Sequence, residues 1–282
     1  MSEPLHLIHI PVALNELARF AHARDRGTIT RRRKDGREVE AGFDEGRALH
    51  HLLDETFGPG SLRPFRLMVA PRKVHGAIYA YTRNNKRALL TIAAETAPPE
   101  VARVLALDTI SEREMPSAWT TGRRLGFDIR VRPVVRVKAG LPDPRQPGTT
   151  YKEGAELDAF FVEALRTHPD GRPKIVDGTP SASAMVTAER TREAVYRDWL
   201  AARLGNAATL DPAATTLQRF ERSRVARLGH APEGPDATFH GELEVGDPEA
   251  FGQLLANGIG RHKAYGYGML MLRPTRKTKR EF

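Results

Sequence analysis

The sequence predicts an α+β protein built from two ferredoxin-like domains, each with the element order β-α-β-β-α-β. Three observations lead to this prediction. Alternating apolar residues mark strands, apolar residues three or four apart mark helices, and the order occurs once on each side of residue 121. The chain has 282 residues, of which 40% are apolar, so it is long enough for two cores. We therefore expect domains at residues 1–121 and 122–282, related in element order but not in sequence.

The charge balance indicates a polyanionic partner. Lysine and arginine number 44 against 35 aspartates and glutamates, which gives a formal net charge of +9 and a pI near 10.0. Such an excess suits nucleic acid or a membrane surface. The chain has no cysteine, so disulfides, thiolate zinc sites and thiol catalysis are excluded. It has neither a secretory signal pattern nor a run of about 18 apolar residues, so we expect a cytoplasmic protein without a membrane span.

The first domain is expected to carry its charge on a loop. Residues 24–40 show no period, and from Arg31 to Arg37 five positive charges stand against one negative. They predict an exposed basic loop, either merely solvated or a mobile arm for phosphates. The expected elements are, in order, a strand at 5–13, this loop, a helix at 44–57, strands at 65–69 and 77–81, a helix at 84–94 and a strand within 105–119.

The helix at 44–57 carries the first candidate functional residue. One apolar arc of this helix consists of Leu49, Leu52, Leu53 and Phe57. His50 lies at the edge of that arc, and Arg47 is its neighbour one turn earlier. His51 points to the polar side.

The second domain begins with a strand whose charged face is basic. From Leu125 to Lys138 apolar and charged residues alternate, which predicts one face in the core and the other exposed. The cations on the exposed face, opposed only by Asp128, are Arg130, Arg132, Arg136 and Lys138. We interpret this face as a phosphate-binding surface, although a charged face also serves solubility. Arg222 and Arg224 of a later strand are candidates for the same role.

The rest of the second domain follows the same element order. Residues 139–188 read as an insertion with one helix, at 151–167, whose apolar face must dock on the body or on a partner. The remaining elements are a helix at 189–204, strands at 216–228 and 238–245, a helix at 248–257 capped by Asp247, and a strand at 269–272.

A glycine-rich loop at 258–268 is the most informative stretch. Its glycines let the backbone approach a ligand, and exposed N–H groups bind anions. A nucleotide-binding loop is disfavoured because this loop follows a helix and opens a strand, and because Ala264 follows Lys263. An elaborate turn is the structural alternative. The loop's candidate ligand-binding residues are Gly258, Gly260, Arg261, Gly266 and Gly268, with Lys263 between them.

With these segments, the chain resembles the CRISPR-associated repeat-processing endoribonucleases, in particular the CasE branch of type I-E systems. Residues 258–270 match the family's loop pattern GxGxxKxxGxGxL. Further likeness covers residues 47–53, 124–136 and 199–210, in the same order. The resemblance leaves out the basic loop and the insertion, and it implies tandem ferredoxin-like domains of the RAMP or RRM type.

The resemblance implies a metal-independent endoribonuclease. Such enzymes cut CRISPR repeat RNA beside its hairpin by attack of the ribose 2′-OH, leaving a 2′,3′-cyclic phosphate and a 5′-OH. It also implies that the protein keeps the 3′ hairpin of the crRNA and joins other subunits of a Cascade-type surveillance complex. We expect no cofactor. We also expect no metal site, because His50, His51 and Asp54 cannot easily converge on one helix face.

The resemblance assigns His50, Lys263 and Arg47 to catalysis. His50 corresponds to the family's histidine and is suited to acid or base work near neutral pH. Lys263 matches the family's lysine, which can stabilise the phosphate. Arg47 stands where the family usually has tyrosine; it cannot act as a general acid but can clamp the phosphate. Two alternatives therefore stay open: a hairpin-binding subunit without catalysis, and an arginine-based enzyme of a type IV system.

Overall fold

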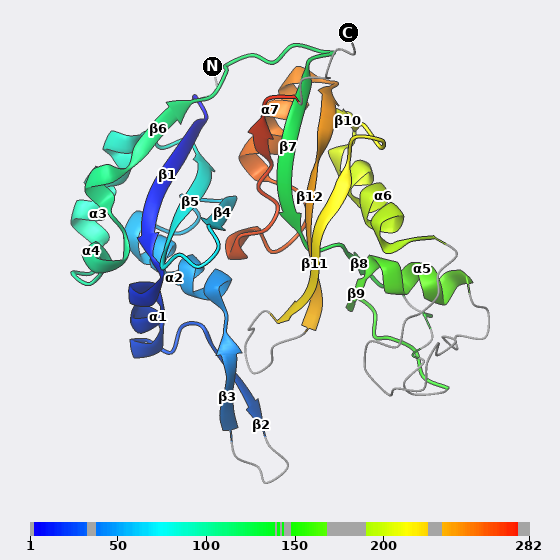
Figure 1. Cartoon of the computed structure of the whole chain (residues 1–282), viewed down its shortest axis with the longest axis horizontal. Helices are drawn as coiled ribbons and strands as arrows, with labels where there is room; N and C mark the ends of the chain where they lie inside the picture. The colour runs from blue at the N-terminus through cyan, green and yellow to red at the C-terminus, as the bar shows by residue number, and fades with distance from the viewer. Residues whose placement is uncertain are drawn as a thin grey trace.

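The computed structural model describes residues 3–32, 38–138, 140–141, 143, 148–167, 190–224 and 233–275. These residues form one four-stranded and one five-stranded sheet, which lie side by side, and two small two-stranded sheets. The four-stranded sheet is drawn in blue to blue-green and the five-stranded sheet in green to red (Figure 1). Helices α3 and α4 cover the outer face of the first sheet, and α6 covers the outer face of the second. None of the described helices is long and apolar enough to cross a membrane.

The first sheet has the strand order β4-β5-β1-β6, and each neighbouring pair is antiparallel. Its strands are β1 (His6–Ala13), β4 (Phe65–Val69), β5 (His75–Thr82) and β6 (Ser111–Glu114). The helices of this half are α1 (Leu14–Ala23), α2 (Glu45–Phe57), α3 (Lys86–Thr96) and α4 (Val101–Val104), with a 3-10 turn, η1, at Leu107–Thr109. The third strand thus lies between the first and the second, which is the ferredoxin-like arrangement.

The second sheet repeats this arrangement. Its order is β10-β12-β7-β13, with β11 also paired to β12, so β11, β12, β7 and β13 again place the third strand between the first and second. The elements are β7 (Arg124–Val131), α6 (Arg192–Leu204), β10 (Ala208–Leu210), β11 (Thr216–Arg224), β12 (Glu233–Val245), α7 (Pro248–Asn257) and β13 (Met271–Arg273). The predicted fold class is confirmed. The domain boundary at residue 121 stays a prediction, with the two sheets on either side of it.

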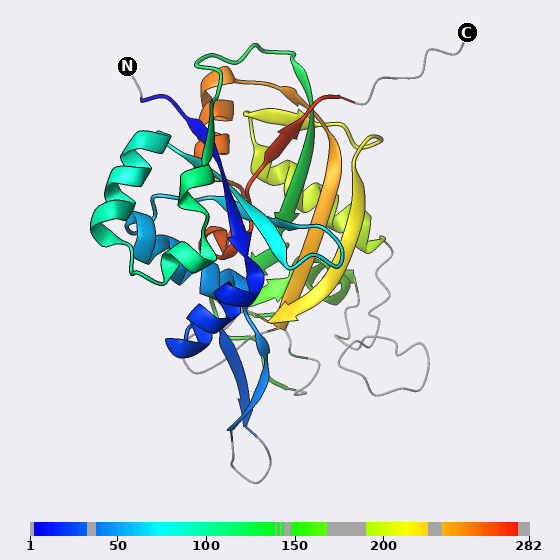
Figure 2. The same cartoon turned by 60° about the vertical axis from the view of Figure 1, so that its left-hand side comes forward.

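Two features of the first half differ from expectation. Helix α1 follows β1 directly and was missed, although it buries Leu17, Phe20 and Ala21 on one face. Much of the segment expected as a loop at 24–40 forms strands: β2 (Thr28–Arg32) and β3 (Glu38–Phe43) pair as a ribbon that projects from the body (Figures 1 and 2). Because charged residues occupy consecutive positions here, the sequence lacks the alternation of apolar and polar residues by which a strand is predicted. Residues 33–37 lie outside the described residues, so the phosphate-arm interpretation stays a prediction.

The strand expected at 125–138 is broken by Pro133, which has no N–H to donate to a ladder. Strand β7 ends at Val131, and β8 (Val134–Arg136) pairs instead with β9 (Glu156–Asp158) in a small separate sheet. Helix α5 (Ala159–Thr167) follows β9 and packs against α6, with Phe160 beneath the Arg192 guanidinium. The inserted helix therefore docks on the body of the protein. Residues 168–189 lie outside the described part of the chain.

The glycine-rich loop packs against both halves of the molecule. Gly258 ends α7 against Pro64, Gly260 lies on the Trp199 ring, and Gly266 lies on the Phe65 ring. Each has a positive φ, between 68° and 81°. A side chain at Gly268 is also blocked, because a Cβ there meets the Ile259 carbonyl oxygen at 2.2 Å. Close packing and backbone conformation thus account for these glycines.

The loop's packing predicts a specific loss of stability for Gly268→Ala. The matched control is Gly122→Ala, because Gly122 has nearly the same φ (+81° against +80°) but nothing within 4 Å of the added Cβ. We expect Gly122→Ala to cost about 1 kcal/mol, from backbone strain alone, and Gly268→Ala about 3 kcal/mol. Urea unfolding measures both free energies. Equal losses would show that the close approach of Gly268 to Ile259 contributes nothing.

Candidate functional site

Helix α2 and the glycine-rich loop meet at the predicted catalytic histidine. Asp44 caps α2 by accepting a hydrogen bond from the Arg47 N–H (2.9 Å), which fixes the first turn. At Gly46 a Cβ would lie 2.6 Å from the Tyr265 carbonyl, so only glycine lets the 3-10 turn η2 (Lys263–Tyr265) approach the helix. One turn further on, the His50 ring meets the Tyr265 ring edge-on, with centroids 5.3 Å apart.

The His50 imidazole lies among cationic groups. Its Nδ1 is 3.2 Å from Arg63 Nη2 and 3.4 Å from Asp54 Oδ2, and Arg63 donates to Asp54 at 2.7 Å. Burial lowers the pKa of His50, and the charges of Arg63, Arg26 and Arg47 lower it further, against the opposing effect of Asp54. A guanidinium can only donate, so its contact with Nδ1 requires the neutral ring. His50 is therefore neutral and able to accept a proton near neutral pH.

A second imidazole shares this environment. The rings of His50 and His51 have centroids 4.9 Å apart. Burial, followed by the charge of Arg26, lowers the pKa of His51 to about 4. Sequence reasoning placed His51 on the polar side and missed Arg26, Arg63 and Tyr265 as neighbours of His50. Their separation in the chain gives no spacing pattern, so no signal in the sequence pointed to them.

The structure brings together the segments that hold all three predicted catalytic residues. Arg47 is half-buried on α2, one turn before His50, and its charge acts on both histidines. Lys263 is half-buried in η2, which packs against α2 and β4. A helix of the first half and a loop of the second half therefore form one composite site. The catalytic roles of His50, Arg47 and Lys263 stay predictions.

The expected exposed basic face of residues 125–138 is wrong for β7, which is buried on both faces. The Arg130 guanidinium forms a two-bond ion pair with Asp236 and lies 4.5 Å from the Tyr267 ring centroid. Arg132, only 4% exposed, donates to Ser223. The alternation was read correctly, but it cannot distinguish a solvated charged face from one that packs on acidic partners.

These arginines form part of a hydrogen-bond network around Tyr267. The Tyr267 hydroxyl donates to Asp236 Oδ2 (2.8 Å) and lies 3.1 Å from Ser223 Oγ. Burial by itself raises the pKa of Asp236, but the Arg130 ion pair and the Tyr267 hydrogen bond outweigh it and hold that pKa below its usual value. We call this set of residues (Arg130, Arg132, Ser223, Asp236 and Tyr267) the Tyr267 network. It fastens the glycine-rich loop to the second sheet.

The remaining predicted RNA-binding residues divide into exposed cations and loop residues. Arg136, Lys138, Arg222 and Arg224 are exposed, with Arg222 paired to Glu233. Arg261 is 46% exposed and pairs with Glu156 at 2.6 Å. Gly258, Gly260, Gly266 and Gly268 pack against protein, as described above. None of these roles in RNA binding is tested by the structure, and they stay predictions.

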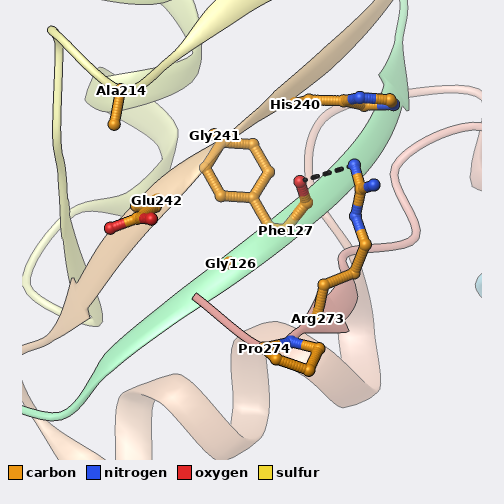
Figure 3. Close-up of a pocket in the computed structure, with 8 residues that line it drawn as sticks. All are labelled: Gly126, Phe127, Ala214, His240, Gly241, Glu242, Arg273 and Pro274. Atoms are coloured by element: carbon orange, nitrogen blue, oxygen red, sulfur yellow. Dashed lines mark hydrogen bonds between the residues drawn. The ribbon is translucent and has the colours of Figure 1, made fainter. Parts of the chain in front are cut away.

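A separate small pocket of about 110 Å³ lies on the second sheet (Figure 3). It is lined by Gly126, Phe127, Ala214, His240, Gly241, Glu242, Arg273 and Pro274. At its border His240 Nε2 lies 2.7 Å from Asp128 Oδ2, and Arg66 of β4 reaches Asp128 Oδ1 at 3.4 Å. Burial is the main cause that lowers the pKa of Arg66 to about 10. The cluster joins the two sheets, and the pocket contains none of the predicted catalytic residues.

The two ferredoxin-like sheets, packed together through the glycine-rich loop, place the protein in the class of tandem ferredoxin-like proteins. The site within this fold contains a histidine surrounded by arginines. A family model described as "CRISPR associated protein" matches residues 18–274. The chain belongs to this family of CRISPR-associated proteins. No curated protein sequence matches it significantly.

Solved structures share the fold at low sequence identity. The CRISPR endoribonuclease Cse3 bound to a 19-nucleotide RNA aligns with a TM-score of 0.58 and 17% identity, over 96% of this chain and 100% of that chain. Thermus thermophilus Cse3, bound to an RNA representing a pre-cleavage complex, gives 0.56 and 18% over 96% and 100%. Cas6e from Escherichia coli str. K-12 gives 0.52 and 16% over 95% and 99%. At such identities the likeness establishes the fold.

The charges around His50 predict opposite pKa shifts for two variants. Arg63→Gln removes a cation that lowers the His50 pKa, so that pKa should rise. Asp54→Asn removes the anion that raises it, so it should fall. Titration of the His50 Cε1 proton by NMR measures both, with His22 as an internal reference. Shifts in the same direction, or none, would contradict the assigned contacts.

The Tyr267 network predicts a stability effect of Asp236→Ala. Removing this carboxylate leaves the Arg130 guanidinium without its main partner, and we expect a loss of about 3 kcal/mol in unfolding free energy. Glu221→Ala is the matched control, because Glu221 pairs with Arg219 at 2.8 Å on an exposed face. Its loss should stay within about 0.5 kcal/mol. Urea unfolding compares the two, and equal effects would count against the network's structural role.

Proposed function

We propose that the protein is an endoribonuclease that cleaves CRISPR repeat RNA beside a hairpin, without a metal ion, and keeps the product. Three observations support the proposal: membership of the CRISPR-associated family, a fold shared with RNA-bound endoribonuclease structures, and the composition of the site. The observation that carries most weight is the neutral, half-buried His50 within a cluster of arginines. That combination suits a reaction in which a proton moves while negative charge develops on a phosphate.

His50 is the proposed general base. When RNA binds, its scissile phosphate competes for the Arg63 guanidinium, which now donates to His50 Nδ1 and to Asp54. Release of Arg63 leaves Asp54 Oδ2 as the partner of Nδ1, so the ring proton moves to that nitrogen. Nε2 then becomes the unprotonated atom that takes the proton of the ribose 2′-OH. Asp54 thus acts as a positioning residue that selects the tautomer.

The cations have a complementary task. Arg47 and Arg63 of the first half and Lys263 of the second half surround the place where the scissile phosphate would lie. In-line attack by the 2′-oxygen adds charge to the phosphorane, and fixed cations stabilise that charge more than they stabilise the ground state. The products would be a 2′,3′-cyclic phosphate and a 5′-OH.

Hairpin recognition is proposed for the exposed cations of the second half. Arg136, Lys138, Arg222 and Arg224 are exposed on β8, the segment after it and β11, where they can contact phosphates of an A-form stem. Arg130 and Arg132 are left out, because both are held in the Tyr267 network. Association with other subunits of a Cascade-type complex belongs to the same proposal. Each exposed cation that meets a phosphate should steepen the salt dependence of binding.

An arginine-based mechanism is the second candidate, and the placement of three arginines around His50 favours it. In this alternative Arg47 and Arg63 stabilise the phosphorane, and His50 only shapes the site. An arginine-based mechanism is the one expected for a type IV system. The two mechanisms differ in which variant loses more activity, His50→Ala or Arg47→Ala.

The decisive experiment is a single-turnover cleavage assay on the cognate repeat hairpin with EDTA present. We expect wild type to cleave, and His50→Ala to slow cleavage by about 10²- to 10⁴-fold because its base is lost. Arg47→Ala should slow it less. Analysis of the RNA ends checks for the cyclic phosphate.

The matched control is His22→Ala, which removes an exposed histidine of α1 far from the catalytic segments in the sequence, and should leave the rate unchanged. A greater loss in Arg47→Ala than in His50→Ala would favour the arginine-based mechanism. Tight hairpin binding without cleavage by wild type would make the protein a binding subunit. Cleavage that requires an added metal ion would overturn the metal-independent mechanism.

A further inference from the structure

Tyr265 is fixed against His50 by two separate contacts. Its ring meets the His50 ring edge-on at 5.3 Å, and its carbonyl occupies the space that Gly46 leaves open on α2. The residue is the last of η2, which lies between the left-handed residues His262 (φ 62°) and Gly266 (φ 81°). The side chain therefore comes from the second half of the chain but belongs spatially to the His50 site.

The hydroxyl of Tyr265 differs from that of the next tyrosine in the loop. Tyr267 is 3% exposed, and its hydroxyl is bound to Asp236 and Ser223. Tyr265 is half-buried, and among the described residues its hydroxyl has no hydrogen-bond partner. Tyrosines at a wet boundary usually direct this group to solvent or to a ligand. One tyrosine of the loop therefore serves the fold, and the other presents a free phenol beside His50.

The cleavage reaction proposed above leaves a proton donor unassigned. Breaking the P–O5′ bond forms an alkoxide, which needs a proton as it departs. Arg47 and Arg63 cannot supply it, since guanidinium groups stay protonated in proteins. His51 cannot either, because its pKa of about 4 leaves it without an acidic proton at neutral pH. Two proton donors remain on the turn that packs against α2: the phenol of Tyr265 and the ammonium of Lys263.

We propose that Tyr265 is the general acid of the cleavage, an inference that rests on the proposed function. His50 Nε2 takes the 2′-OH proton while the 2′-oxygen forms a bond to phosphorus. The P–O5′ bond breaks, and its electron pair accepts the proton of the Tyr265 hydroxyl. The phenolate that remains regains a proton from the His50 imidazolium, directly or through water. This transfer restores both groups, whose ring centroids lie 5.3 Å apart.

The test replaces the leaving oxygen with sulfur. A repeat RNA with a 5′-bridging phosphorothiolate at the scissile position releases a thiolate, which departs without protonation because thiols are far stronger acids than alcohols. Tyr265→Phe keeps the ring that packs on His50 and removes only the hydroxyl. We expect it to slow cleavage of the oxygen substrate by about 10²- to 10³-fold and to cleave the sulfur substrate at nearly the wild-type rate. His50→Ala should remain slow on both.

Controls separate this role from a structural one. Tyr79→Phe removes a phenol from β5, outside the site, and should match wild type on both substrates. An equal defect of Tyr265→Phe on both substrates, or no defect, would overturn the proposal. If the sulfur substrate restored the rate of Lys263→Gln but not that of Tyr265→Phe, the general acid would be Lys263, and the proposal would be overturned as well. Failure of wild type on both substrates would instead refute the proposed endonuclease function, and the inference with it.

Discussion

The ion pair between Arg130 and Asp236, closed by the Tyr267 hydroxyl, is the interaction on which the candidate site depends. Burying a carboxylate that is 3% exposed costs free energy unless a cation and hydrogen bonds satisfy it, and Arg130 and Tyr267 supply both. The network fixes the loop to the second sheet at residue 267. Tyr265, only two residues earlier, is thereby held against α2 of the first half. A buried ion pair in one sheet thus sets the geometry around a histidine that belongs to the other.

The charges at the site act in two ways at once. Burial is the main cause that lowers the pKa of His50, and the arginines around the ring lower it further. In the proposed function the same arginines attract the scissile phosphate. A phosphate bound there would offset part of the positive charge and so raise the pKa of the His50 ring. Among the described residues, Asp54 is the only carboxylate in contact with the ring, and it is also paired with Arg63. In the proposed mechanism, affinity for the substrate and the protonation state of His50 are therefore linked.

Periodicity and capping residues were enough to predict the two ferredoxin-like halves, because these signals are local. They also predicted helix α2, which begins after its cap Asp44, and helix α7, which begins after its cap Asp247. The charged face of β7 could not be predicted, since Arg130 finds Asp236 at a distance of 106 residues along the chain. An alternating strand has the same sequence whether its charged face meets water or acidic partners. His50 was identified through the resemblance, but Arg26, Arg63 and Tyr265 reach it only through tertiary structure. Pairing between residues 28–32 and 38–43 likewise forms a ribbon where the sequence predicted a loop.

The division of labour inside the glycine-rich loop follows from its packing. Its glycines meet Pro64 and Phe65 of the first half and Trp199 of the second, so they form the joint where the loop crosses between the halves. This packing explains why glycine stands at these positions, and a role of their backbone in RNA binding stays a prediction. Tyr267 and Arg261 are bound to Asp236 and Glu156, which leaves Lys263 and Tyr265 on the turn that faces α2. Since His50 and Arg47 come from the other half, neither half holds a complete site, and assembly of the two is a condition for any reaction there.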